Sequence, residues 1–120
     1  MDETIAVVRT VVIKVNDMAR ERAFWAAVLG APVAREIGEF FCWFEPQQPG
    51  GVSVALQLVA EPKAAGRNRL HLDTTVDDLA AARGRIEELG GSHVEDHDMG
   101  GFRWTVMADP EGNEFCIASG

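Results

Sequence analysis

The sequence lacks the features of several protein classes. Its 120 residues contain no apolar run that approaches the roughly 18–20 residues of a membrane-spanning helix. Its acidic start has neither the basic region nor the long apolar region of a secretory signal peptide, so we expect a cytoplasmic protein. It also has no nucleophile motif, no phosphate-binding glycine loop and no dinucleotide-binding fingerprint. The sequence therefore points away from membrane proteins and nucleotide-dependent enzymes.

Positive charge is also scarce. The chain has 11 Lys and Arg residues against 19 Asp and Glu residues, which gives a formal net charge of −8. Nucleic acids and anionic membranes bind basic surfaces, so neither is expected as a partner. The acidity instead favours a neutral or cationic small molecule as ligand.

Cysteine is limited to Cys42 and Cys116, which is too few for a disulfide framework. A reducing compartment would keep both side chains as thiols. The simplest interpretation of each is a buried packing thiol, because cysteine is among the most buried residue types.

What the sequence does contain is a pattern that occurs twice. The first half begins with a stretch rich in β-branched residues and continues with an Asp-capped helix that ends at a glycine. Three shorter stretches typical of strands follow. We expect strands at about 7–15, 32–37, 40–45 and 52–59, and a helix over about 18–30. Phe24 and Trp25 in this helix are expected to pack against a sheet.

The second half repeats this order. Thr10 precedes the helix cap Asp17 by seven positions, and His71 precedes Asp78 by the same number. We expect strands at about 69–76, 92–96, 102–108 and 114–118, and an Asp-capped helix in the stretch 77–90, with Gly90 past its end. The sequence thus predicts one α+β domain, residues 1–120, of two βαβββ modules at about 7–59 and 69–118, with a link over 60–68.

Four residues on equivalent strands are candidates for chemistry. The first strands offer Thr10 and His71, and the last strands offer Gln57 and Cys116. If the two sheets curl together, these residues surround one cleft. Near them, Asp73 shares a strand face with His71, and Glu114 shares one with Cys116. Thr10 is expected mainly as a good strand residue, and His71 can also be a satisfied histidine within its sheet.

This pattern resembles the vicinal oxygen chelate superfamily, which includes glyoxalase I, bleomycin resistance proteins and extradiol dioxygenases. Three stretches that cover most of the chain carry the resemblance: "VVIKVNDMARERAFWAAVLGA", "LHLDTTVDDLAAARGRIEELGG" and "ADPEGNEFCIA". The helix end Phe-Trp-x-x-Val-Leu-Gly and the turn Asp-Pro-x-Gly-Asn are fairly specific in combination. Within the superfamily, the group called glyoxalase-like domains is the most similar, since it also carries a "HLD" strand.

The resemblance implies a curled mixed sheet around a cleft, often in a homodimer. It also implies a divalent metal ion held by four side chains, typically His or Gln on the first strand and Glu on the last strand of each module. These positions fall on Thr10, Gln57, His71 and Cys116, of which only His71 matches. His71, Cys116 and Gln57 could hold Zn²⁺, but the set does not suit oxygen-rich coordination of Mn²⁺, Fe²⁺ or Ni²⁺. We therefore expect no catalytic metal, although a divalent ion is possible.

Several side chains are candidates for contacts with a small organic ligand in the cleft. Aromatic residues of the third strands could form its floor, although core packing is the simpler interpretation. The candidates for ligand binding are Gln57, Asp73, Trp43, Trp104 and Arg103, and a solvated surface position is the alternative for Arg103.

The leading hypothesis is a cytoplasmic protein, likewise expected as a homodimer, that binds a small organic molecule without a catalytic metal. The first alternative is a lyase, isomerase or dioxygenase of the glyoxalase type with an atypical metal site around His71. The second is a metal-free enzyme that uses His71 or Glu114 for proton transfer. The stretch "EDHDMGG" (95–101) is predicted to be an exposed acidic loop with a glycine hinge, which could cover the cleft as a flap.

Overall fold

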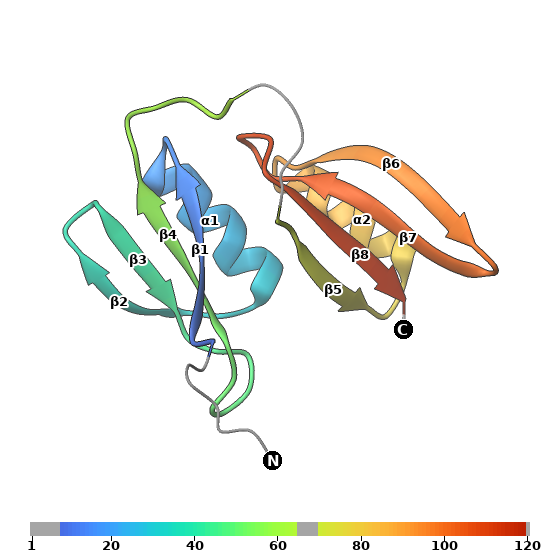
Figure 1. Cartoon of the computed structure of the whole chain (residues 1–120), viewed down its shortest axis with the longest axis horizontal. Coiled ribbons are helices and arrows are strands. Elements are labelled where there is room, and N and C mark those ends of the chain that lie inside the picture. Colours follow the sequence, from blue (N-terminus) through green and yellow to red (C-terminus); the bar gives the residue numbers. More distant parts are fainter. Residues whose placement is uncertain (1–7, 65–69, 120) are drawn as a thin grey trace, which may run out of the picture. The chain divides into compact units, whose positions relative to one another are not determined.

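The chain folds into two compact units, and the division between them falls between Glu61 and Pro62. Each unit is described by itself (Figure 1). The computed structural model describes residues 8–64 and 70–119. Residue 69, the predicted start of the second module, and part of the predicted link 60–68 therefore lie outside the described residues. Within the described ranges, neither helix has the length and apolar character needed to span a membrane.

Module one is a four-stranded sheet with one helix. Its sheet has the order β1-β4-β3-β2, in which β1 and β4 are parallel and the other neighbours are antiparallel. Its elements are, in chain order, β1 (Thr10–Val15), α1 (Met18–Leu29), β2 (Val33–Ile37), β3 (Phe41–Phe44) and β4 (Ser53–Leu58).

Module two repeats the same topology, with the sheet order β5-β8-β7-β6 and a parallel pair β5 and β8. The α+β class and the βαβββ modules are thus confirmed. Its elements are β5 (Leu72–Val76), α2 (Leu79–Glu88), β6 (Ser92–Met99), β7 (Phe102–Ala108) and β8 (Glu114–Ser119).

Local chemistry explains where the helices begin. Asp17 and Asp78 have extended backbones, and each side chain accepts a hydrogen bond from the third following backbone N–H, at 3.0 and 2.9 Å. Each cap thereby satisfies one of the N–H groups that a helix start leaves without a partner. The first helix ends at Gly30, whose φ of 61° lies in the left-handed region that glycine adopts without strain.

Each helix covers one face of its own sheet. In module one, Phe24 and Trp25 are buried, as predicted, together with sheet residues Val15, Cys42, Phe44 and Leu56. In module two, Ile86 of α2 is buried with Met107, Phe115 and Ile117. The apolar residues that alternate along the strands therefore form the core of each module.

The structure corrects the prediction for residues 95–101. Strand β6 continues to Met99, and Gly100 and Gly101 form the turn to β7 with φ values of 62° and 91°. Two residues of positive φ are what a tight hairpin turn requires, because that turn follows the twist of the strands. The predicted acidic loop with a hinge was therefore wrong: the segment is a paired strand.

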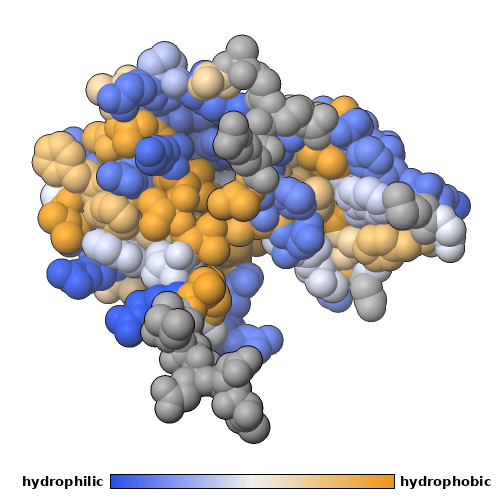
Figure 2. All heavy atoms as spheres, viewed as in Figure 1, coloured by the Kyte–Doolittle hydropathy of each residue, from blue (hydrophilic) through white to orange (hydrophobic). Residues whose placement is uncertain are grey.

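The surface in Figure 2 differs between the modules. Hydrophobic residues gather over the strands of module one, whereas hydrophilic residues are more frequent over module two in the same view. Exposed apolar side chains of module one include Val12 and Ile37, which lie on strands β1 and β2.

Candidate functional site

The sheet of module two has one face covered by α2 and one free of its helix. Arg83 of α2 lies 3.9 Å from Asp96 of β6, so the side chains that alternate with Asp96 belong to the other face. The pairing of neighbouring strands then shows which residues of the other strands share this second face, which we call the helix-free face of module two. Its polar and aromatic residues are His71, Asp73, Thr75, Ser92, Glu95, His97, Phe102, Trp104, Glu114 and Cys116.

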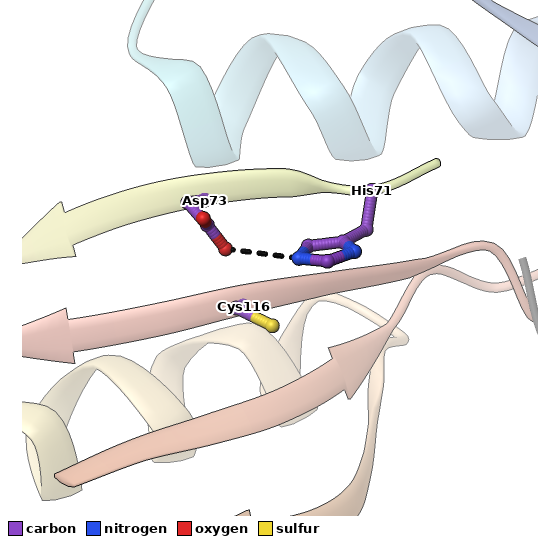
Figure 3. Close-up of side chains that lie close together, drawn as sticks. All are labelled: His71, Asp73 and Cys116. Atoms are coloured by element: carbon purple, nitrogen blue, oxygen red, sulfur yellow. Dashed lines mark ion pairs between the residues drawn. The ribbon is translucent and has the colours of Figure 1, made fainter. Parts of the chain in front are cut away.

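Three of these residues lie close together at one edge of the face (Figure 3). Asp73 of β5 and Cys116 of β8 are direct cross-strand neighbours, and His71 directly precedes β5. His71 Nε2 lies 3.1 Å from Asp73 Oδ1, and one potential ligand atom from each of the three residues lies within 4.8 Å of the others. Half of the His71 side-chain surface and 82% of that of Asp73 are exposed, while Cys116 is half-buried. We call this group the His-Asp-Cys cluster.

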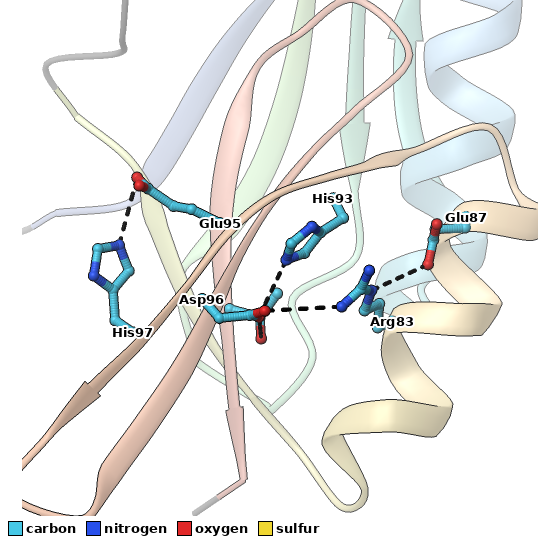
Figure 4. Close-up of polar contacts among 7 residues, drawn as sticks. Arg83, Glu87, His93, Glu95, Asp96 and His97 are labelled. Carbon is cyan, nitrogen blue, oxygen red and sulfur yellow. Dashed lines mark hydrogen bonds and ion pairs between the residues drawn. The ribbon is translucent and has the colours of Figure 1, made fainter.

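A second group occupies the other edge of the same face. The His97 ring stacks on Trp104 with 4.8 Å between centroids and an interplanar angle of 13°, and Phe102 lies 5.5 Å from Trp104. Glu95 Oε1 is 3.4 Å from His97 Nε2 (Figure 4). We call Glu95, His97, Phe102 and Trp104 the aromatic edge.

The sequence interpretation did not name Glu95 or His97 as site residues, because it ended the strand at about 96 and described 95–101 as a loop. A signal was available: two glycines between a polar alternating stretch and an aromatic one are typical of a two-residue hairpin turn. That hairpin pairs His97 directly with Trp104.

The opposite face carries a separate polar network (Figure 4). Asp96 accepts a hydrogen bond from Thr105 Oγ1 at 2.8 Å, and its Oδ1 lies 3.1 Å from His93 Nε2. The Thr105 hydrogen bond and then the His93 contact hold the pKa of the Asp96 carboxyl below its usual range. Because this network joins β6 and β7 on the face that α2 covers, we assign it to the support of the fold.

Two further predicted site residues lie on different faces of the sheet. Arg103 alternates with Trp104 and is therefore on the opposite face, where its Nε lies 3.2 Å from Asp98 Oδ2. Glu114 is on the helix-free face at the start of β8, half-buried and paired with Ala108. Because Leu72 pairs with Phe115, the parallel register brings Glu114 to the His71 end of the cluster.

Module one has a corresponding helix-free face with different residues. Thr10 Oγ1 and Ser53 Oγ are hydrogen-bonded at 3.1 Å, and Gln57 is paired with Lys14 rather than with Thr10. Trp43 stacks on Phe41 with 4.3 Å between centroids, and Arg35 lies 5.3 Å above the Trp43 ring. Thr10, Gln57 and Trp43 thus share a sheet face, but no metal-ligating histidine, cysteine or carboxylate lies with them on the described strands of this face.

Strand register shows which positions correspond between the modules. Val12 pairs with Ala55 in module one, and Asp73 pairs with Cys116 in module two. Both residues of the second pair follow those of the first by 61 positions in the sequence (73 − 12 and 116 − 55). The position of module one that corresponds to Cys116 is therefore Ala55, whereas Gln57 lies two residues further along its strand.

The chain matches one family model, described as a glyoxalase-like domain, over residues 10–118. No curated protein sequence matches the chain significantly.

Solved structures show the same fold at low sequence identity. A fosfomycin resistance protein of Listeria monocytogenes, a mutant in complex with Mn(II) and dihydroxypropylphosphonic acid, is 15% identical, with a TM-score of 0.78 and coverage of 98% of this chain and 92% of that one. A glyoxalase-related enzyme of Fulvimarina pelagi is 16% identical, with a TM-score of 0.76 and coverage of 97% and 89%. Lactoylglutathione lyase of Agrobacterium tumefaciens is 18% identical, with a TM-score of 0.70 and coverage of 98% and 96%.

Proposed function

Because the chain belongs to the glyoxalase-like domain family, within the vicinal oxygen chelate superfamily, we propose that it binds a small organic molecule on the helix-free face of module two. The observation that carries this proposal is the concentration of exposed and half-buried polar and aromatic side chains on that single face. Neighbours of this fold include a fosfomycin resistance protein in complex with Mn(II) and dihydroxypropylphosphonic acid, and a lactoylglutathione lyase, and the names of both refer to small molecules.

The charges on this face favour a cationic ligand. Asp73, Glu95 and Glu114 all lie on it, and its described strand positions include no lysine or arginine. Trp104 offers a ring to which a cation or a flat ring is attracted, and Phe102 beside it is 58% exposed. A flat organic cation would therefore find both a stacking surface and negative charge.

The four-ligand metal centre of metal-dependent relatives does not fit these residues. The corresponding strand positions of module one hold Thr10, whose hydroxyl is bonded to Ser53, together with Val12 and Ala55. A hydroxyl, two hydrocarbon side chains and the amide of Gln57 supply no charge to a divalent ion, which oxygen-rich sites for Mn²⁺ obtain from carboxylates. We therefore propose that ligand binding does not depend on that centre.

Direct binding measurements test this proposal. Isothermal titration calorimetry in the presence of a chelator would compare flat aromatic cations with anionic analogues of the same shape. We expect selective binding of cations, and Trp104→Ala should weaken it by about 2- to 12-fold, the worth of one aromatic contact. Phe40→Ala, an exposed aromatic of module one, serves as the control and should leave the affinity unchanged.

The same titration tests the predicted contributions of Gln57 and Trp43 in module one. Retention of affinity in Trp43→Ala would confine the site to module two, and loss would add module one to it. Equal affinity for cations and anions would contradict the proposed ligand class. The predictions of a cleft, a homodimer and a cytoplasmic location stay predictions.

One observation favours a second function, proton transfer by His71. Its Nε2 lies 3.1 Å from Asp73 Oδ1, and a carboxylate at that distance orients the imidazole. A catalytic role predicts activity that resists chelators and disappears in His71→Ala. The activity assay would use substrates found among the compounds that bind.

A further inference from the structure

The His-Asp-Cys cluster combines three different ligand types on two adjacent strands of one module. His71 offers an imidazole nitrogen, Asp73 a carboxylate oxygen and Cys116 a sulfur, all within 4.8 Å of one another. In a tetrahedral zinc centre, ligand atoms lie about 3.6 Å apart, as bond lengths of about 2.0–2.3 Å imply. His71 Nε2 and Asp73 Oδ1 are already 3.1 Å apart. Side-chain rotation that moves the ligand atoms by about 1 Å would therefore bring the cluster to the geometry of a zinc site.

The surroundings permit this rotation. The side chains of His71 and Asp73 are 50% and 82% exposed, so they change rotamer without disturbing the core. Cys116 is held by the pairing of β8 with β5 and β7, which gives the cluster one fixed ligand position. The two exposed ligands can thus adjust to an ion that the sulfur anchors.

Charge and ligand type select the ion. A thiolate and a carboxylate balance the two positive charges of the ion, and a neutral imidazole completes the set. Sulfur and nitrogen ligands favour Zn²⁺, whereas Mn²⁺ prefers oxygen ligands. We propose that His71, Asp73 and Cys116 form a zinc site within module two, with a fourth coordination position open to water or to a ligand.

This site differs from a four-ligand centre that needs both modules. All three of its ligands belong to module two, and Asp73 takes the place that the sequence interpretation gave to Gln57. The proposal also goes beyond the proposed function, because the ion binds whether or not an organic molecule does.

Cobalt substitution tests the site with the metal alone. Co²⁺ would be titrated into the metal-free full chain under reducing conditions, and the thiolate-to-cobalt charge-transfer absorption recorded. We expect a one-to-one complex with this absorption, which Zn²⁺ abolishes and an equal excess of Mn²⁺ does not. Cys116→Ser should remove the charge-transfer band, and His71→Ala should weaken Co²⁺ binding by at least about tenfold.

Two further variants keep the test decisive. Asp73→Asn changes an exposed side chain, so it retains the fold and should weaken Co²⁺ binding by about tenfold or more. His97→Ala removes another histidine that is paired with a carboxylate on the same face, and it should leave Co²⁺ binding unchanged. Circular dichroism would confirm that each variant is folded.

Three results would overturn the proposal: no charge-transfer band in the unmodified chain, a band that persists in folded Cys116→Ser, or displacement by Mn²⁺ as effective as by Zn²⁺. Organic ligand binding is measured in the presence of a chelator. Failure of the zinc site and failure of the proposed function therefore give separate results.

Discussion

The two modules share one backbone plan and differ in chemistry. Strands β4 and β8 begin at Ser53 and Glu114 and end at Leu58 and Ser119, which are the same 61 residues apart, since 114 − 53 = 119 − 58 = 61. At this offset the two tryptophans of the sheets also correspond, Trp43 to Trp104. One fold therefore displays two different sets of side chains at matching positions.

The difference is clearest on the helix-free faces. Where module two places His71, Asp73 and Cys116, module one places a threonine, a valine and an alanine. Module one carries Lys14 and Arg35 on this face, while the matching face of module two carries carboxylates. The fold thus supplies the positions, and the chemistry belongs to module two.

In the helices, by contrast, the larger and more polar buried residues belong to module one. Trp25 and Ile86 are each the eighth residue after their helix caps, and both are buried. In module one, the fully buried Glu21 accepts a hydrogen bond from Trp25 Nε1 at 3.1 Å, and the matching residue of module two is Ala82. Module one therefore relies on one large residue and a buried polar contact.

The largest expected effect follows from this difference in the cores. Trp25→Ala should lower the free energy of unfolding by about 3–5 kcal/mol through lost packing, and further because a buried carboxylate loses its donor. Ile86→Ala should cost less, about 2–4 kcal/mol. Urea unfolding followed by circular dichroism measures both variants.

Trp25→Phe keeps a six-membered aromatic ring and removes the indole N–H together with the five-membered ring, so it retains most of the packing while it removes the hydrogen bond to Glu21. An Ile86→Ala variant as unstable as Trp25→Ala would show that the two cores depend equally on their central helical residue.

The fold was accessible from the sequence because its signals are local. Asp17 and Asp78 cap helices by bonds to residues three positions away, and Asp109 stabilises the Asp-Pro turn by accepting bonds from the backbone N–H groups of Glu111 and Asn113, at 2.9 and 2.8 Å. Such short-range chemistry can be recognised in a sequence.

The candidate site was only partly accessible, because strand register is not local. The sequence interpretation compared Gln57 with Cys116, but pairing across the sheet makes Ala55 the corresponding residue. Residues two positions apart on a strand lie on the same face of the sheet but have different cross-strand neighbours. By contrast, the pairing of His97 with Trp104 follows from a local hairpin that the sequence interpretation did not recognise.

A second test compares the connections between helix and second strand. Gly91 and Ala31 both donate a backbone hydrogen bond to the carbonyl five residues earlier, at 3.0 and 3.2 Å. A Cβ atom at Gly91 would lie 2.6 Å from Ile86 Cγ2 and 2.9 Å from Ala108 O, so α2 approaches β7 closely there.

Gly91→Ala should therefore destabilise module two by about 1–3 kcal/mol. Ala31→Gly in module one should cost about 1–2 kcal/mol, because it adds backbone freedom and removes a buried methyl group. Thermal unfolding of both variants and of the unmodified chain measures these costs. An unchanged midpoint in Gly91→Ala would mean that the close approach at Gly91 relaxes without cost.

The two cysteines give a third, kinetic comparison. Burial raises the pKa of the Cys42 thiol, the Glu36 carboxylate raises it further, and Arg22 opposes this weakly. Because the thiolate is the nucleophile, iodoacetamide should modify the half-buried Cys116 at least about tenfold faster than Cys42.

Peptide mass spectrometry of the folded, zinc-free chain measures the two rates, and the urea-unfolded chain, in which they should converge, is the control. Added Zn²⁺ should slow the reaction of Cys116 alone. Faster modification of Cys42 would contradict its buried position in module one.

The smallest expected effect concerns the hydrogen bond from Thr105 to Asp96, for which module one has no matching donor, since the residue that matches Thr105 is Phe44 (105 − 61 = 44). The folded pKa of Asp96 lies below its ordinary value, first because Thr105 donates to it and then because of His93. The carboxylate therefore contributes stability above an ordinary pKa of about 3.9, and this contribution disappears as the pH falls through the folded value. Asp96→Asn and Thr105→Val should be less stable than the unmodified chain at pH 6, and the difference in melting midpoint should shrink towards pH 2. A difference that stays constant over this range would show that Asp96 acts through packing rather than through its charge.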